Sequence, residues 1–221
     1  MMMNLFSIFD PSTSNFFSLN WISIFPLFFI HPSWYWANPS RYQMLWKKMI
    51  LKILEEVKNN LSMKNQKFII MFISIFSSIL TFNCLGLLPY IFTPTSHIVL
   101  SMMFAFPIWI SLMLKGWLTS FNKMMTHLVP MGAPILLTSF MVVIETISNI
   151  IRPLTLSVRL SANMISGHLL IHLLTSIPFS LPNMMLPIFP VMLTLLILET
   201  AVAIIQSYVF ITLSSLYTNE I

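Results

Sequence analysis

The chain alternates long apolar stretches with short polar connections, and several stretches have the length of a membrane helix. Residues 68–88 are 21 positions without a charged side chain, ended by Pro89. Because about 20 apolar residues in a helix cross the hydrocarbon layer of a bilayer, this stretch predicts a membrane span. A turn leads to a second apolar stretch at 98–118. Residues 67–119 therefore predict a helical hairpin.

The apolar stretch nearest the N-terminus covers residues 12–31 and is less regular. Asn20 and Pro26 interrupt it, but its length still suits a span, and we interpret it as the first one. No basic region precedes it and Asp10 lies there instead, which is atypical of a cleaved secretory signal. We therefore expect this span to belong to the mature protein.

Residues 40–63 have a different pattern, in which apolar side chains recur at helical spacing and polar ones fall mainly on the other side. Ser40 and Gln43 have the spacing of a capping box, which is typical of a helix start. The segment therefore predicts an amphipathic helix, lying in the membrane interface in contact with the lipid bilayer. The apolar positions are Tyr42, Trp46, Met49, Ile53, Val57 and Leu61.

Two long apolar segments follow, at residues 134–177 and 186–217. As a helix, the first would be about 66 Å long, whereas the hydrocarbon layer is only about 30 Å thick. It is therefore either two spans broken near Pro153 or one strongly tilted helix. Because no polar loop interrupts it, we favour a tilted helix with a local kink at Pro153. The whole pattern predicts a single membrane domain, 1–221: all-α and multi-span, with one interfacial amphipathic helix and two long, tilted C-terminal helices.

Composition and charge exclude several classes of protein. Only 8% of the residues are charged and 57% are hydrophobic, whereas a soluble domain carries about 25% charged residues. The basic and acidic residues of 41–67 account for the whole net charge of +5. One basic segment fits the positive-inside rule, and without a second basic face it argues against a nucleic-acid partner. The segment contains Arg41, Lys47, Lys48, Lys52, Lys58, Lys64 and Lys67, with Glu55 and Glu56.

The candidate chemistry lies in the two long segments, which hold Glu145, Arg152, Arg159, His168 and Glu199. A charge at the centre of a membrane helix costs about 2.5–3.5 kcal/mol on insertion scales, so such residues face a partner or a water-filled cavity and by default indicate an ion path. Glu145, Arg152 and Arg159 are seven residues apart and drift by only about 20° per step around a helix. His168 is nine residues beyond Arg159, on the opposite side.

Smaller residues refine this picture. Asn163 follows Arg159 by four positions and lies near the same face, and Gly167 beside His168 lets a neighbouring helix approach closely. Glu199 and Gln206 are seven apart and share a face of the last helix. These spacings predict a polar path between the two long helices.

No pattern for catalysis, a metal or a cofactor competes with an ion path. Cys84 is the only cysteine, which excludes an intrachain disulfide and a cysteine-based metal site. His168 and His172 could ligate a haem between helices, but a facing histidine pair is lacking. We therefore expect no catalytic residue, no metal and no cofactor. A redox-complex subunit would need that pair, and an independent channel or transporter would predict inverted repeats, which the sequence lacks.

The stretch SVRLSANMISGH (157–168) resembles the signature of the subunit a family of F-type ATP synthases, in its mitochondrial form. The likeness continues in NCLGLLPY (83–90), FTPT (92–95), VVIETISNIIRP (142–153) and LETAVAIIQSYVF (198–210). It covers the chain from about Asn83 onward, and the first 82 residues match only in general pattern.

The resemblance implies a proton-translocating, non-catalytic subunit, multi-pass in the mitochondrial inner membrane. Its partners would be the rotating c-subunit ring and other membrane-sector and peripheral-stalk subunits of ATP synthase. Two half-channels would deliver protons to the ring and remove them, so that proton flow drives ATP synthesis. Arg159 matches the arginine that faces the ring and separates them.

The resemblance also assigns the other path residues. Asn163, His168, Glu199 and Gln206 match polar positions of the intermembrane-side path, and Glu145 matches the matrix-side exit. Bacterial relatives usually carry an acid where His168 stands and a histidine where Glu199 stands, so the pair is reversed here. Three simpler interpretations stay open: Glu145 as an interfacial acid, Asn163 and Gln206 as interhelical hydrogen-bonding residues, and His168 with Glu199 as a structural pair. Arg152 is not part of the signature and suits an interfacial, snorkelling position.

Overall fold

All regular structure that the computed structural model describes is helical, which confirms the all-α class. It describes residues 5–14, 17–25, 38–63, 65–88, 90–129, 134–180 and 185–220. The α-helices are α2 (Arg41–Asn60), α3 (Ile69–Gly86), α4 (Ile98–Thr119), α5 (Phe121–Leu128), α6 (Ile135–Ser180) and α7 (Met185–Glu220). The 3₁₀ helices are η1 (Leu5–Phe9), η2 (Leu19–Ile24), η3 (Gln66–Phe68) and η4 (Pro94–Ser96).

Four segments of the described chain are long and apolar enough to cross a membrane, namely 66–86, 98–119, 137–178 and 185–219. This confirms a multi-span protein with long C-terminal helices. The predicted first span, 12–31, lies partly outside the described residues, at 15–16 and 26–31. Its described part contains the short helix η2. A membrane span there stays a prediction.

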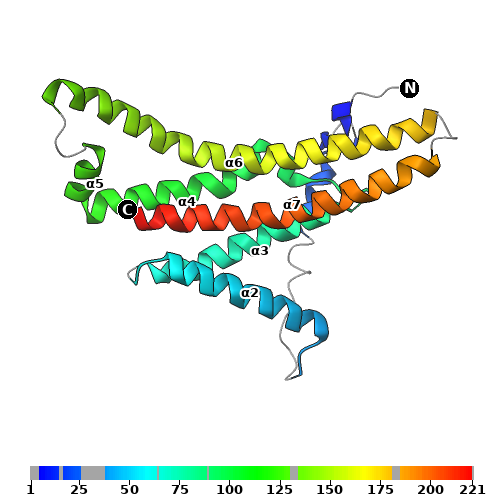
Figure 1. Ribbon diagram of the computed structural model, residues 1–221, viewed down its shortest axis with the longest axis horizontal. Coiled ribbons are helices and arrows are strands. Elements are labelled where there is room, and N and C mark those ends of the chain that lie inside the picture. Colours follow the sequence, from blue (N-terminus) through cyan, green and yellow to red (C-terminus); the bar gives the residue numbers. More distant parts are fainter. Residues whose placement is uncertain are drawn as a thin grey trace.

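The helices α3, α4, α6 and α7 form two layers, and α2 lies at one edge beside α3 and α7 (Figure 1). The long helices α6 and α7 run side by side and antiparallel, because the connection between them is short. Behind them, α3 packs mainly on α7 and α4 mainly on α6. The 3₁₀ helix η4 contacts α3, α4 and α6 and is buried among them. The two helices of the predicted hairpin, α3 and α4, therefore pack against different long helices.

Helix α2 begins with the predicted capping box. The Ser40 side chain accepts a hydrogen bond from the Gln43 backbone, and the Gln43 side chain accepts one from the Ser40 backbone. The helix is amphipathic, but only Val57 near its end is buried, and Leu61 follows in the cap. Figure 1 shows α2 diverging from α3 and α7 toward its N-terminal end. It is thus attached chiefly by its C-terminal turn.

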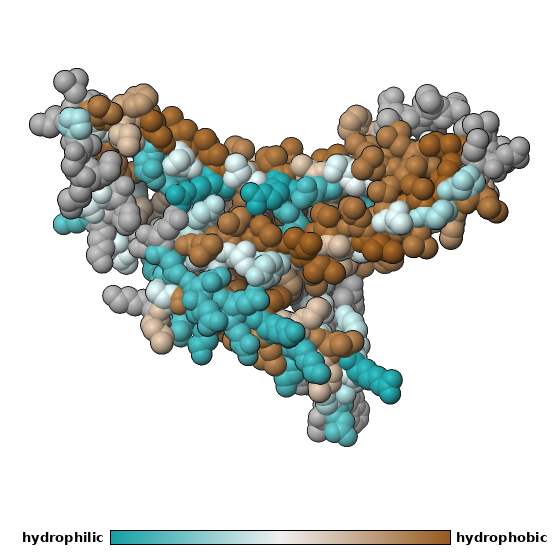
Figure 2. All heavy atoms as spheres, viewed as in Figure 1, coloured by the Kyte–Doolittle hydropathy of each residue, from teal (hydrophilic) through white to brown (hydrophobic). Residues whose placement is uncertain are grey.

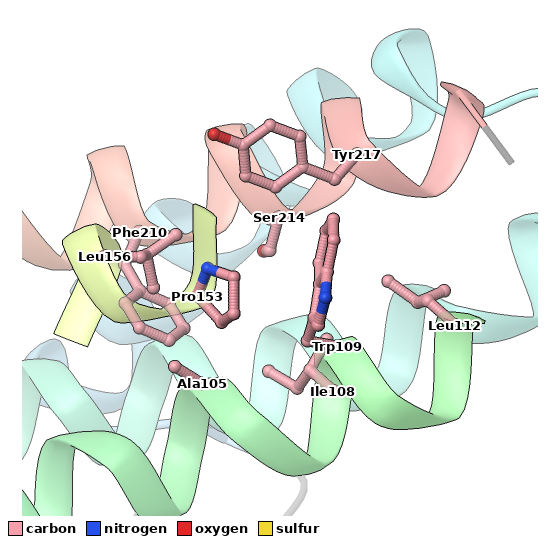
Figure 3. A pocket seen from close by; sticks show the side chains of 9 residues that line it. All are labelled: Ala105, Ile108, Trp109, Leu112, Pro153, Leu156, Phe210, Ser214 and Tyr217. Carbon is pink, nitrogen blue, oxygen red and sulfur yellow. The ribbon is translucent and has the colours of Figure 1, made fainter. Parts of the chain in front are cut away.

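Helix α6 is continuous through Pro153, which settles the alternative left open by the sequence in favour of one helix. Its 46 residues correspond to about 69 Å, and Figure 1 shows it bowed. A proline inside a helix removes one backbone hydrogen bond and is a common cause of bending. Pro153 is buried and lines a small apolar pocket of about 20 Å³, where Figure 3 shows its ring facing Trp109 of α4.

Buried hydroxyl groups in the spans are satisfied inside their own helices. Ser77, Ser157, Ser207 and Ser214 each donate to the carbonyl three residues earlier, at 2.7 to 2.9 Å. Hydrocarbon offers no water to bond such groups, so the backbone carbonyl is their nearest partner. These serines therefore pack as small residues and do not demand polar neighbours.

The end of α7 is tied to the segment after α2 by polar contacts. Asn65 accepts a hydrogen bond from Lys115 Nζ at 2.8 Å and donates one to the Thr218 carbonyl at 2.8 Å. Asn219 donates from its side chain to the Asn60 carbonyl. The C-terminal turn of α7, the end of α2 and the end of α4 thus meet on one side of the membrane.

The visible surface divides by chemistry, as Figure 2 shows. Hydrophilic residues gather over α2 and in a broken stripe along the middle of α6, and hydrophobic residues cover most of α6 and α7 to either side. A stripe of polar residues inside an apolar surface is what an ion path facing a partner would need.

This arrangement predicts the topology of the chain. In a Cys84→Ala background, cysteines at Met63 and Leu118, which are 84% and 86% exposed, should react with an impermeant maleimide from the same side of sealed vesicles. A cysteine at the fully exposed Tyr90 should react only from the other side, because α3 and α4 each cross once. Labelling of Met63→Cys and Tyr90→Cys from one side would contradict the topology.

Candidate functional site

Arg159 lies in the middle of α6 on its exposed face. Its neighbours on this face are Thr155, Val158 and Ala162, which are also exposed and are small or apolar. Two residues on, Ser161 points the opposite way and is buried against the rest of the chain. The helix thus presents a permanently charged guanidinium on a surface that is otherwise suited to hydrocarbon.

One turn further along α6, Asn163 turns toward α7. Its Nδ2 atom donates a hydrogen bond to Gln206 Oε1 at 3.1 Å. Gln206 is buried and Asn163 is half-buried. The structure therefore brings together two predicted path residues from different helices, one turn away from Arg159.

Glu199 lies two turns before Gln206 on the same side of α7 and is only 6% exposed. Its side chain packs directly against Gly167 of α6. A Cβ atom on Gly167 would lie 2.7 Å from Glu199 Cδ and 3.1 Å from Cγ, with the Oε1 atom closer still. The close approach that Gly167 was expected to allow is therefore confirmed, and the group that approaches is the acid itself.

A groove of about 170 Å³ runs between α6 and α7 beside these residues. It is lined by Asn163, Ser166 and Gly167 on one wall and by Glu199 on the other, with apolar residues around them. Both Glu199 carboxylate oxygens are buried, and neither has a hydrogen-bond partner within the described part of the chain. The groove has room for several water molecules, which is the environment that an uncompensated carboxyl group requires.

His168 does not join this groove, although its neighbour Gly167 does. Consecutive helix residues point about 100° apart, so the imidazole faces another side of α6. There it meets Phe9 edge-on, with ring centroids 6.4 Å apart. The structure shows no hydrogen bond between His168 and Glu199, so the predicted pairing of these two side chains is not present in this arrangement.

Glu145 and Arg152 lie in the N-terminal half of α6. Glu145 is half-buried and lies fourteen residues from Arg159, or about 21 Å along the axis. Arg152 is half-buried, and its guanidinium lies over the Tyr217 ring, 5.1 Å from the centroid. Arg152 is thus attached to α7 by a cation–π contact.

Two residues that link helices near the site were not predicted from the sequence. Asn83 of α3 is fully buried, and its Nδ2 atom lies 3.5 Å from the Ala203 carbonyl of α7, which links α3 to the helix that carries Glu199 and Gln206. Tyr217 was not expected to hold Arg152. The sequence contained a signal for Asn83, because an asparagine inside an apolar span needs a hydrogen-bond partner. It contained none for Tyr217, because tyrosine is common at membrane interfaces.

Comparison with known proteins decides the family. The sequence matches the model of the ATP synthase A chain family over residues 14–219. The chain belongs to this family. It is similar to ATP synthase subunit a of Locusta migratoria (53% identical over 224 residues), of Aedes aegypti (51% over 225) and of Drosophila melanogaster (50% over 223), in each case over the full length of both chains.

Membership in the ATP synthase A chain family fixes the general function. The chain is a proton-translocating subunit of the membrane sector of ATP synthase, and it is not the catalytic subunit of that complex. The match also reaches into the first 82 residues, where the sequence carried no recognisable motif. Arg159, Asn163, Glu199 and Gln206 are therefore candidates for the residues that handle protons.

The contact between Gly167 and Glu199 predicts the effect of one added methyl group. Gly167→Ala should push the Glu199 carboxyl out of its present position and slow ATP-driven proton pumping by the assembled complex. The subunit should still assemble, because the atoms displaced are the end of a flexible side chain. Acidification of reconstituted vesicles would measure the pumping rate.

Ser166→Ala is the matched control, since it lies in the same groove and adds no atoms. It should pump at nearly the normal rate. Equal pumping by the Gly167→Ala and control variants would show that the position of Glu199 is not critical.

Proposed function

We propose that this chain forms the stationary side of a rotary proton path, in which Arg159 faces a ring of c subunits and separates two half-channels. The observation that carries the proposal is the charged Arg159 on an exposed, otherwise apolar face of α6. An arginine in contact with lipid at mid-helix is costly. Another protein surface that carries an opposite charge offsets this cost, and a ring of helices with one carboxylate each would present it.

The groove between α6 and α7 supplies one half-channel of this proposal. Glu199 and the bonded pair of Asn163 and Gln206 line a route for water-borne protons to the level of Arg159. His168 lies one residue beyond the groove and contributes from the adjoining face of α6. These four residues form the intermembrane-side path.

Glu145 belongs to the other half-channel, toward the matrix. It shares the long helix α6 with Arg159 but lies on the far side of it from Asn163. A proton released from a ring carboxylate on that side would meet Glu145 before reaching water. Arg159 thus stands between the entry residues and the exit residue.

Arg159 serves this path by keeping its charge. A guanidinium stays protonated at every accessible pH, so it cannot pass a proton on as a carboxylate or an imidazole can. It stabilises the ionised form of a passing carboxylate and opposes the direct crossing of a proton between the half-channels. Each leaked proton forfeits about 2.3 kcal/mol per 100 mV of membrane potential, which is why the barrier matters for coupling.

The proposal also includes the membrane in which the chain works, its orientation and its neighbouring subunits. It works in the mitochondrial inner membrane, with the basic helix α2 on the matrix side as the positive-inside rule favours. The c-subunit ring covers the face of Arg159, and other membrane-sector and peripheral-stalk subunits hold the chain against rotation. The chain itself catalyses no reaction of ATP, and its part is to convert proton flow into movement of the ring.

Replacing Arg159 by alanine tests the proposal. In complexes that still assemble, Arg159→Ala should abolish ATP synthesis and increase passive proton conductance through the membrane sector, because the barrier is lost. Arg159→Lys should also couple incompletely, since a desolvated lysine can lose its proton. ATP synthesis and proton leak are measured in vesicles that contain equal amounts of assembled complex.

Arg152→Ala is the matched control, seven residues earlier on the same helix. It removes a charge that lies over Tyr217, so assembly should suffer, while the complexes that form should stay coupled. Normal ATP synthesis in Arg159→Ala vesicles would refute the assignment.

A further inference from the structure

Outside the proton path, a large apolar wedge lies between α2, α3 and α7. It has a volume of about 830 Å³ and opens where the N-terminal half of α2 diverges from the other two helices (Figure 1). Trp46 and Lys52 line it from α2, Cys84 from α3, and Ile205 and Tyr208 from α7. We call this region the α2 wedge. It lies outside the proton path, because neither Arg159 nor the α6–α7 groove borders it.

The walls of the α2 wedge are apolar and offer few free polar groups. Thr81 on the α3 wall uses its hydroxyl to bond the carbonyls of its own helix, at 2.9 and 3.0 Å. Tyr208 on the α7 wall interacts with the Glu56 side chain of α2. Apolar side chains such as Leu45 and Ile205 are left 65% and 58% exposed. A hydrocarbon chain suits these walls, whereas a polar ligand would find almost nothing to bond.

The charge at the mouth of the wedge favours a negative group. Lys52 lines the wedge, and α2 carries two further lysines, Lys47 and Lys48, about one turn before it. The one acid in the lining, Glu56, lies in the C-terminal half of α2, and no acidic residue precedes Glu55 in this helix. A basic, amphipathic helix beside an apolar cavity is the arrangement that binds an anionic headgroup at the membrane surface.

We propose that the α2 wedge binds an anionic phospholipid of the bilayer, with an acyl chain between α2, α3 and α7 and the phosphate at Lys52. The lipid would support the N-terminal half of α2, which has no buried side chain of its own before Val57. Lys52 provides the charge, Trp46 lies at the interface, and Cys84 and Ile205 contact the chain. A helix of a partner protein is the rival occupant, and the experiment below separates the two.

The test uses the assembled complex reconstituted with phospholipids that carry a photoreactive group in the acyl chain. Phosphatidylglycerol and phosphatidylcholine with the same acyl chain are compared, and cross-linked peptides are identified by mass spectrometry. Anionic lipid should label the α3 and α7 walls of the wedge in preference to zwitterionic lipid. Lys52→Gln should weaken this preference by roughly fivefold, the effect of one lysine near an anionic surface.

Two matched controls complete the design. Lys58→Gln removes the same charge from the same helix outside the wedge and should leave the preference intact. Cys84→Phe should reduce labelling by either lipid because its ring projects into the wedge, whereas Cys84→Ala should not. Equal labelling by both lipids, equal effects of Lys52→Gln and Lys58→Gln, or unlabelled wedge walls would overturn the proposal, the last because it would indicate a protein helix there.

Discussion

The close approach of α6 and α7 determines where the polar groups of this protein can lie. Gly167 lets the Glu199 side chain rest against the backbone of α6, and the bond between Asn163 and Gln206 fixes the two helices one turn away. Because the contact buries the acid and the amides between the helices, Arg159 is the one ionisable side chain that is exposed among those described in α6. The other two spans pack against this pair of helices, α4 mainly on α6 and α3 mainly on α7.

Much of the fold follows from the sequence because hydrocarbon leaves so few options. Backbone groups in a membrane must bond within their own segment, so apolar runs of the right length at 68–88 and 98–118 specify helices. Pro153 shows the limit of this reasoning. A proline allows either a break or a bend, and its packing against Trp109 and Tyr217 of other helices is a tertiary fact that no local pattern contains.

The contacts of the candidate residues were only partly predictable from the sequence. Spacing on one helix gives the angle at which a side chain leaves the axis, and so it separated Arg159 from His168 and predicted that Gly167 would let a neighbouring helix approach. It does not give the rotation of the neighbouring helix. Glu199 therefore meets Gly167, while His168, about 100° further around α6, meets Phe9 from the N-terminal segment.

The length of α6 has a geometrical consequence for transport. A helix of about 69 Å confined to a layer of about 30 Å advances about 62 Å sideways as it crosses. Glu145 and Arg159, about 21 Å apart along the axis, are then separated by about 19 Å in the plane of the membrane. On the proposed path, a proton that enters beside α7 and leaves near Glu145 has to be carried laterally over this distance, which is the movement that a rotating ring of carboxylate-bearing helices would provide.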